Sequence, residues 1–298
     1  MSFYQFCIDN KIPFKKNEMM KNHTSFKIGG SADYFIECDC PECLKKVFAE
    51  LKNRKMPYLV LGKGSNLLVS DKGYRGAVIS LSGFDKITVE NDEIIAGAGA
   101  SLAKLCVAAL ENKLTGLEFA YGIPGSVGGA LYMNAGAYGG EMSQVVVSAT
   151  VLNKDGNIKE IDLCDMCLGY RTSIFKTDGS IILSVKFGLK KGDSANIKAQ
   201  MDDFMTRRKD KQPLEFPSAG STFKRPMGHF AGALIEKNNL KGMSVGGAMV
   251  SEKHAGFVIN YDNATANDVK SLMQKIKDVV LKNDGVELEP EVIFVGEE

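Results

Sequence analysis

The 22 residues from Phe119 to Gly140 include no charged side chain, and seven of them are glycine. The segment is long enough to cross a bilayer, but Pro124, Asn134 and three tyrosines interrupt the continuous apolar surface that a spanning helix needs. Closely spaced glycines instead let the backbone turn tightly and approach a bound molecule. The stretch therefore predicts ligand-holding loops in a globular protein, with no membrane insertion.

The charge balance argues against partners that bind through a strong overall field. The chain has 298 residues with 37 basic and 36 acidic side chains, a formal net charge of +1. Such a chain is not expected to bind nucleic acid or an anionic membrane through its overall field. The first ten residues contain no basic start followed by an apolar core, so we expect no signal peptide and a cytoplasmic location. The oligomeric state does not follow from the sequence, and a monomer is the expectation.

Hydrophobic periodicity predicts strands and helices without a regular βαβ alternation, which favours an α+β fold. Apolar residues at helical spacing predict helices over residues 41–55, 102–110, 195–211 and 267–282, the second capped by Ser101. Short apolar runs between turn residues predict strands over residues 58–61, 67–69, 76–81, 87–90, 94–97, 145–152 and 181–187.

Two glycine-rich segments have the chemistry of phosphate-binding loops. The loop Gly62–Asn66 directly follows a predicted strand, and its backbone N–H groups can turn toward an anion. In the longer uncharged stretch, the segment Gly125–Ala130 is expected to begin a short helix whose free N–H groups face a pyrophosphate. Neither segment is a dinucleotide-binding fingerprint, because Leu67 stands where the third glycine would follow Gly62 and Gly64. No Walker A motif is present either.

The seven cysteines are an odd number, and a disulfide framework is not expected in a cytosolic chain. Two clusters, Cys38–Cys40–Cys43 and Cys164–Cys167, could together offer four thiolates to zinc. More than a hundred residues separate the two clusters, so we favour ordinary small side chains and predict no metal site.

Six sequence blocks, in order from about residue 20 to the C-terminus, resemble one family. The blocks are Asn22–Gly30, Leu61–Leu68, Ile123–Ala130, Gly169–Lys176, Ala219–Pro226 and Leu288–Val292. They are similar to those of the MurB family, the UDP-N-acetylenolpyruvoylglucosamine reductases of bacterial cell-wall synthesis. Six blocks in the same order are far more specific than any single motif.

The resemblance implies both a fold and a reaction. The fold would be a two-part FAD-binding module of the vanillyl-alcohol-oxidase (PCMH) type plus a C-terminal α+β substrate domain. We expect the first FAD-binding part over residues 1–80, joined by the tail at about 288–298, the second over 81–194, and the UDP-sugar domain over 195–287. NADPH would reduce a non-covalent FAD. The flavin would pass hydride to C3 of UDP-N-acetylglucosamine enolpyruvate, giving UDP-N-acetylmuramate for peptidoglycan synthesis.

The resemblance also implies catalytic and cofactor-binding residues. Ser221 matches the family's proton donor to C2, and Arg171 and Glu291 match the pair that flanks the enolpyruvyl carboxylate. A guanidinium and a protonated carboxyl there would stabilise the charge that hydride transfer places on this carboxylate. The predicted FAD-binding residues are Gly62, Lys63, Gly64, Ser65, Asn66, Gly125, Ser126, Gly128, Gly129, Asn134, Gly136 and Ala137.

Three further residues are candidates for binding the UDP-sugar. Tyr170, beside the predicted catalytic arginine, is a plausible substrate contact, and Lys211 and Arg225 are candidates for the diphosphate, which favours fixed positive charge and forked donors. A cation at a helix C-terminus also complements the helix dipole, so both interpretations of Lys211 stay open. No histidine is assigned a role.

The chain resembles the shorter type of the family. Longer members carry an inserted segment, with a tyrosine that closes over the substrate, between the arginine and serine blocks. Here 49 residues separate Arg171 from Ser221, and none is tyrosine, which leaves open what covers the substrate. Two other functions also stay open: a flavin oxidase or dehydrogenase of the same fold acting on an alcohol or sugar acid, and a nucleotide-binding or zinc-stabilised regulatory protein without catalysis.

Overall fold

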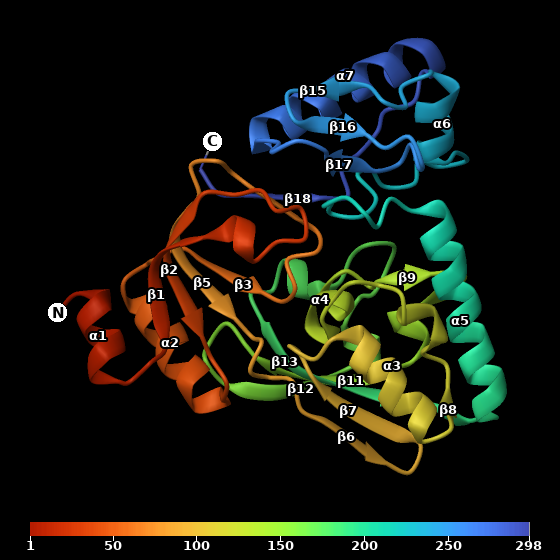
Figure 1. Cartoon of the computed structure of the whole chain (residues 1–298). Coiled ribbons are helices and arrows are strands. Elements are labelled where there is room, and N and C mark those ends of the chain that lie inside the picture. Colours follow the sequence, from red (N-terminus) through yellow and green to blue (C-terminus); the bar gives the residue numbers. More distant parts are fainter. Residues whose placement is uncertain (298) are drawn as a thin grey trace. The chain divides into compact units, whose positions relative to one another are not determined.

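The computed structural model describes residues 1–297, and the chain divides into two compact units. Unit 1 consists of Met1–Lys15, Tyr34–Lys63 and Gly76–Arg207, and unit 2 of Lys16–Asp33, Gly64–Arg75 and Arg208–Glu298. Each unit has its own cluster of buried apolar side chains. Figure 1 shows the elements of both units coloured along the chain.

A five-stranded antiparallel sheet forms the centre of unit 1. Its order is β12-β11-β13-β7-β6, with bounds Ile158–Asp162, Val146–Leu152, Ile181–Gly188, Glu93–Gly97 and Ile87–Glu90. Helices α3 (Leu102–Glu111) and α4 (Val127–Tyr132) contact the sheet and each other (Figure 1). The Ser101 hydroxyl accepts a hydrogen bond from the Lys104 N–H and caps α3, and the apolar face of α3 is buried.

A second sheet lies nearer the N-terminus in sequence. It has four strands in the order β1-β2-β5-β3, with bounds Phe14–Met19, Ser31–Glu37, Tyr74–Ser80 and Tyr58–Leu61. Strands β3 and β5 are parallel, with Tyr58 opposite Ala77. Helix α2 (Pro41–Asn53) connects β2 to β3 and buries Leu44, Val47, Phe48 and Leu51 at the predicted spacing. Helix α1 (Phe3–Asp9) precedes this sheet, and α5 (Ser194–Lys211) follows strand β14 (Lys190–Lys191).

The remaining regular elements before α5 are short. The pairs are β8 (Leu114–Thr115) with β14 (Lys190–Lys191) and β9 (Gly136–Ala137) with β10 (Gly140–Glu141). The 3-10 helices are η1 (Met20–Asn22), η2 (Glu118–Ala120), η3 (Met142–Gln144), η4 (Leu163–Asp165) and η5 (Ile174–Lys176).

Unit 2 is built on a small antiparallel sheet with two helices. The strands β15 (Ser244–Val245), β16 (Ala248–Val250) and β17 (Val258–Asn260) pair in that order, and α7 (Ala266–Asp284) contacts β15, β16 and α6 (Ala231–Lys237). The Asp71 carboxylate accepts hydrogen bonds from the N–H groups of Ala266 and Asn267, at 2.8 and 3.2 Å. It therefore caps α7 together with the capping box of Thr265 and Asp268.

The C-terminal strand β18 (Ile293–Val295) is parallel to β4 (Leu67–Val69). The tail thus lies beside a segment that is more than two hundred residues away in the sequence. The predicted boundary after residue 80 falls between β5 and β6, and the one before residue 195 falls at the start of α5. These domain boundaries stay a prediction.

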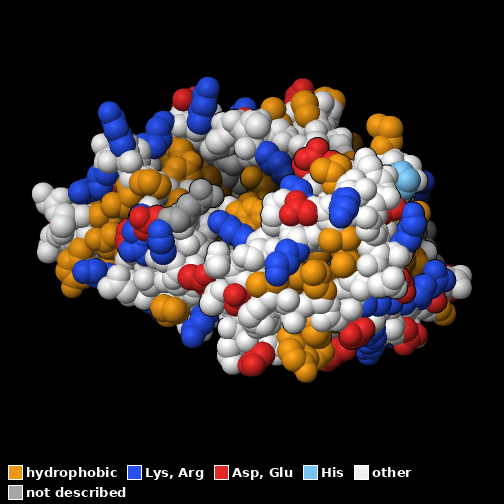
Figure 2. Space-filling view, turned by 90° about the horizontal axis from the view of Figure 1, so that it is seen from above, with side chains coloured by type: hydrophobic (Ala, Val, Ile, Leu, Met, Phe, Trp, Pro, Cys, Tyr) orange, Lys and Arg blue, Asp and Glu red, His pale blue; other side chains and the backbone are white. Residues whose placement is uncertain are grey.

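The predicted elements agree with the structure to within a few residues. The four predicted helices correspond to α2, α3, α5 and α7, and the strands over 58–61, 67–69 and 87–90 have the predicted bounds. Helices α1 and α6 were not predicted, since seven residues are too few to show a clear helical period. No helix within residues 1–297 is long and apolar enough to cross a membrane. On the face seen in Figure 2, basic and acidic side chains are interspersed, in line with the small net charge.

Candidate active site

The predicted proton donor and the predicted carboxyl group lie on two paired segments of unit 2. The Glu291 N–H donates to the Thr222 carbonyl at 2.9 Å, and the Lys224 N–H donates to the Glu289 carbonyl at 2.8 Å. Phe223 and Pro290 form an antiparallel bridge between them. Ser221 therefore immediately precedes Thr222, whose carbonyl accepts a hydrogen bond from the Glu291 backbone.

The segment around Ser221 is anchored by its neighbours rather than by the serine itself. Thr222 and Phe223 are 5% and 3% exposed, whereas Ser221 is an exposed residue. The Thr222 N–H donates to the Gly256 carbonyl at 2.9 Å, and its hydroxyl oxygen accepts from the Val258 N–H at 2.8 Å. Ser221 thus lies at the surface of unit 2. The next residue, Thr222, forms three hydrogen bonds with backbone groups of other segments.

The predicted FAD-binding residue Asn66 lies beside Glu291. Its side-chain amide donates to the Glu291 carbonyl at 3.1 Å, and its own carbonyl accepts from the Ile293 N–H at 2.9 Å. Sequence separation between these residues exceeds two hundred positions. The parallel pairing of β4 and β18 brings them together.

The backbone N–H groups of the loop Gly62–Asn66 bear on its predicted role in anion binding. Within residues 1–297, the N–H groups of Lys63, Gly64 and Ser65 donate to no backbone carbonyl. Gly64 has φ +60°, and a Cβ atom there would lie 2.1 Å from the His23 carbonyl oxygen. Only glycine fits this position. Anion binding by the N–H groups of this loop stays a prediction.

The second glycine-rich segment differs from its prediction in one respect. The short helix is present as α4, capped by Ser126, whose hydroxyl accepts from the Gly129 N–H at 3.3 Å. However, the Val127 and Gly128 N–H groups donate to the carbonyls of Ala100 and Ala98, both at 2.9 Å. The expectation of free N–H groups at this helix start is therefore wrong for these two residues, because they pair with the segment before α3. Cofactor binding by Gly125, Ser126, Gly128 and Gly129 stays a prediction. It would have to involve atoms other than the paired N–H groups of Val127 and Gly128.

The two glycine-rich segments touch within unit 1. A Cβ atom on Gly62 would lie 2.1 Å from the Ser126 hydroxyl oxygen, so no side chain fits between them. The sequence predicts each segment as a separate phosphate-binding loop, and only the structure shows that the two are in contact.

Asn134 connects the glycine-rich stretch to the predicted catalytic arginine in unit 1. It is 1% exposed, its amide nitrogen donates to the Gly169 carbonyl at 3.1 Å, and its amide oxygen accepts from the Ser143 N–H at 3.0 Å. Its side chain is thus a structural brace. Gly136 and Ala137 follow as strand β9.

Arg171 occupies an unusual backbone conformation two residues after Gly169. Its φ is +55°, a left-handed value that is strained for an arginine. The Lys176 ammonium donates to the Arg171 carbonyl at 2.6 Å, and the guanidinium lies 5.1 Å from the ring centroid of Tyr170. Tyr170 is 53% exposed. The two predicted substrate-side residues of unit 1 therefore form one stacked pair at its surface.

The two candidates for the diphosphate are both exposed residues of unit 2. The Arg225 guanidinium lies 3.9 Å from the ring centroid of Phe230, and this stacking orients it. Lys211 is the last residue of α5, so the structure leaves its two interpretations open. Lys224, next to Arg225, forms an ion pair with Glu289.

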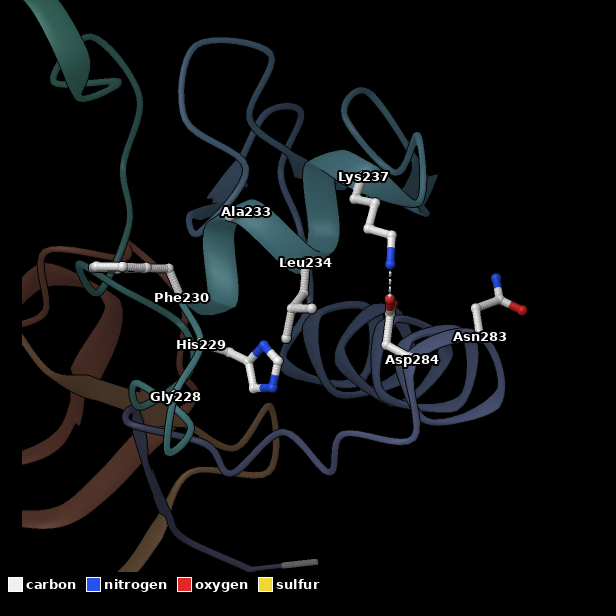
Figure 3. Close-up of a pocket in the computed structure, with 8 residues that line it drawn as sticks. All are labelled: Gly228, His229, Phe230, Ala233, Leu234, Lys237, Asn283 and Asp284. Atoms are coloured by element: carbon white, nitrogen blue, oxygen red, sulfur yellow. Dashed lines mark hydrogen bonds and ion pairs between the residues drawn. The ribbon is translucent and has the colours of Figure 1, made fainter.

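A pocket of about 520 Å³ lies beside Phe230, and none of the predicted site residues lines it. It is lined by Gly228, His229, Phe230, Ala233, Leu234, Lys237, Asn283 and Asp284 (Figure 3). The close-up shows the Lys237 ammonium and the Asp284 carboxylate pointing at each other. Their nitrogen and oxygen atoms lie 2.5 Å apart. This bond to Lys237 lowers the pKa of Asp284 below its ordinary value. Because its one lysine is paired, the pocket is a poor site for a phosphate.

The cysteines do not form a metal centre in the part of the chain that the structure describes. No group of three or more histidine, cysteine or acidic side chains within residues 1–297 is arranged to hold a metal ion. The Cys38 and Cys43 sulfur atoms lie 3.5 Å apart as free thiols. Burial raises the pKa of Cys38 and Cys43, and raises that of Cys7 to about 11, so these thiols stay protonated at neutral pH.

Comparisons with known proteins agree with the arrangement. Residues 212–295 match the model described as UDP-N-acetylenolpyruvoylglucosamine reductase, C-terminal domain, and residues 32–162 match an FAD binding domain. The chain is 50% identical over 289 residues to a UDP-N-acetylenolpyruvoylglucosamine reductase of Clostridium novyi, covering 97% of this chain and 94% of the relative. It is 47% identical over 304 residues to that of Clostridium tetani, covering 100% and 99%.

The chain belongs to the UDP-N-acetylenolpyruvoylglucosamine reductase family. The crystal structure of the Thermus caldophilus member is 34% identical and has a TM-score of 0.83, covering 95% of this chain and 99% of that one. Physcomitrella patens BBE-like 1, at 12% identity and a TM-score of 0.50, covers 64% of this chain and 45% of its own and shows a shared fold only. The predicted family, the α+β class with an FAD-binding module and C-terminal domain, and the FAD cofactor are confirmed. The roles of individual residues stay predictions.

Two residues that support the Ser221 segment, Thr222 and His254, were not predicted from the sequence. Thr222 lies inside the block Ala219–Pro226, but nothing in its local sequence indicates that it anchors the backbone next to Ser221. His254 is far from every block and had no local signal. Only the tertiary hydrogen bonds show that both residues support the Ser221 segment.

Proposed function

We propose that the protein is an FAD-dependent reductase that uses NADPH to convert UDP-N-acetylglucosamine enolpyruvate to UDP-N-acetylmuramate, a precursor of peptidoglycan. Family membership over nearly the whole chain supports the reaction. The observation that carries the mechanism is the pairing of the Ser221 segment with Glu291 through the Thr222 carbonyl. We also infer a cytoplasmic enzyme that acts on small molecules alone.

The loop Gly62–Asn66 fits the cofactor that the family requires. Its unused N–H groups would bind the FAD pyrophosphate, and Gly64 keeps the backbone open because a side chain would collide with His23. When bound, FAD supplies the redox chemistry, accepting hydride from NADPH and passing it to C3 of the substrate. The residues of the chain would bind and orient FAD and the substrate, and would protonate C2 of the substrate.

Ser221 would deliver the proton to C2. A free serine hydroxyl is a weak acid, so it transfers a proton only to a strongly basic carbon and from a fixed position. The three hydrogen bonds made by Thr222 fix the backbone next to it. Until that proton arrives, Glu291 and Arg171 would stabilise the negative charge that hydride addition places on the substrate carboxylate, Glu291 by donating a hydrogen bond in its protonated form.

Arg225 would bind the UDP diphosphate. A guanidinium offers fixed positive charge and paired donors in one plane. The Phe230 ring beneath it limits the directions in which it can point, which lowers the entropy lost on binding. Lys211 would add a second positive charge.

Anaerobic half-reactions on the purified yellow protein test the proposal. NADPH should bleach the flavin absorbance, and UDP-N-acetylglucosamine enolpyruvate should restore it with formation of UDP-N-acetylmuramate. Bleaching by NADPH without recovery on adding the enolpyruvyl sugar would favour a flavin oxidase or dehydrogenase acting on another substrate.

A further inference from the structure

His254 lies in a turn of unit 2 with a defined ring orientation. Its Nδ1 atom accepts a hydrogen bond from the Gly256 N–H at 3.1 Å, and its carbonyl accepts from the Phe257 N–H at 3.0 Å. The ring also packs edge-on against Phe257, with centroids 5.0 Å apart. Because Nδ1 accepts, the ring is neutral and carries its proton on Nε2.

The same turn holds the Ser221 segment. The Gly256 carbonyl accepts from the Thr222 N–H at 2.9 Å, and the Thr222 carbonyl accepts from the Glu291 N–H at 2.9 Å. A continuous chain of hydrogen bonds therefore runs from the His254 ring through Gly256 and Thr222 to the backbone of Glu291. Ser221 is the residue that immediately precedes Thr222.

The surroundings of His254 keep its ring neutral. Burial is the largest cause that lowers the pKa of His254 below its ordinary value. A backbone hydrogen bond opposes this shift and raises the pKa, as does Glu236, whereas Lys241 and Lys211 lower it further. A protonated ring would carry a hydrogen on Nδ1 and could no longer accept from Gly256.

We propose that His254 is a positioning residue for proton transfer, holding Ser221 and Glu291 in register through Gly256 and Thr222. The inference rests on the proposed function, since it concerns the half-reaction that uses the proton. It assigns His254 no contact with substrate or cofactor. A displaced hydroxyl should slow proton delivery by about 10- to 100-fold, the cost typical of a misplacement of about 1 Å.

The acceptor at Nδ1 can be removed or kept by choice of variant. In His254→Asn the amide oxygen replaces Nδ1, whereas His254→Leu has no acceptor. We expect both variants to be reduced by NADPH at nearly the wild-type rate in stopped flow. Reoxidation by the enolpyruvyl sugar should fall about 10- to 100-fold in His254→Leu and no more than about 3-fold in His254→Asn. His229→Leu, a histidine outside this chain of bonds, is the matched control.

If His254→Leu does not fold, His254→Gln replaces it, because the longer amide reaches the Nε2 position and leaves Gly256 without its acceptor. The ratio of wild-type to His254→Asn reoxidation rates should fall as the pH drops below the ordinary histidine range, since only the imidazole loses its acceptor on protonation. Equal reoxidation rates in the asparagine and leucine (or glutamine) variants, or a ratio independent of pH, would overturn the proposal. Failure of the wild type itself to be reoxidised would instead refute the proposed function.

Discussion

The Ser221 segment and the loop Gly62–Asn66 use opposite parts of the chain for chemistry. In the first, the backbone is engaged in hydrogen bonds around Thr222, and the side chain of Ser221 is exposed. In the second, the N–H groups of Lys63, Gly64 and Ser65 donate to no backbone carbonyl of the described residues. Gly64, at the centre of the loop, has no room for a side chain. One region therefore acts through a side chain on a fixed backbone, and the other through the backbone itself.

This difference determines which substitution should disable each region. Removing a side chain should damage the first region and leave its fold intact, because Thr222 rather than Ser221 makes the anchoring bonds. Adding a side chain should damage the second, because its glycines lie against other atoms. The helix start at Ser126 is a third case, in which glycines serve packing.

The largest effect is expected from Ser221→Ala. Reoxidation of the flavin by the enolpyruvyl sugar should slow by about 10²- to 10⁴-fold, the contribution of a positioned acid, while reduction by NADPH stays near the wild-type rate. Stopped-flow absorbance under anaerobic conditions measures both steps. Slower reduction, or no change in either step, would show that the proton comes from another group.

Gly64→Ala should chiefly weaken FAD binding. The new methyl group would lie 2.1 Å from the His23 carbonyl oxygen, and its φ of +60° disfavours alanine, so the loop must move. Loss of one or two loop hydrogen bonds should lower FAD affinity by about 10- to 100-fold. Fluorescence titration of the apoprotein with FAD measures this change.

Gly285→Ala is the matched control for this substitution. Gly285 follows the last residue of α7 and has φ +68°. Apart from its chain neighbours, a Cβ atom there would meet no described atom within 4 Å, so the alanine variant has the backbone strain without a collision. The substitution should lower stability by about 1 kcal/mol and leave FAD affinity unchanged. Equal losses of FAD affinity in the two variants would mean that strain, not loop geometry, is responsible.

The sequence predicts more of the fold than of the site. Helices α2 and α7 follow from apolar residues at helical spacing, because each is amphipathic along its whole length. The helix start at Ser126 is also readable from its composition. No local sequence pattern shows which carbonyl each N–H group bonds. The N–H groups of Val127 and Gly128 donate to the carbonyls of Ala100 and Ala98, about thirty positions earlier. Phosphate binding depends on which donors remain unpaired, and tertiary structure decides that.

Gly128→Ala should mainly lower stability. A Cβ atom would lie 2.8 Å from that of Ala98, and overpacking of this kind costs about 1–3 kcal/mol. Gly129→Ala, one position later in the same helix, meets only the Ser126 hydroxyl oxygen at 3.2 Å and should be neutral or slightly stabilising. Urea unfolding of the two apoproteins measures the difference. If Gly128→Ala had normal stability but failed to bind FAD, the start of α4 would bind the FAD pyrophosphate after all.

The smallest effect expected is a coupling between Gly62 and Ser126. Gly62→Ala places a methyl group 2.1 Å from the Ser126 hydroxyl oxygen, and Ser126→Ala removes that oxygen along with its hydrogen bond to the Gly129 N–H. Each single change should lower the free energy of unfolding, the serine change by about 1 kcal/mol as for other helix caps. In the double variant the collision is largely absent, so the combined loss should be smaller than the sum of the two single losses by about 0.5 kcal/mol or more. Urea unfolding of the four apoproteins completes the cycle. Strict additivity would show that the loop moves away from α4 freely, and that the contact between the two glycine-rich segments does not constrain either one.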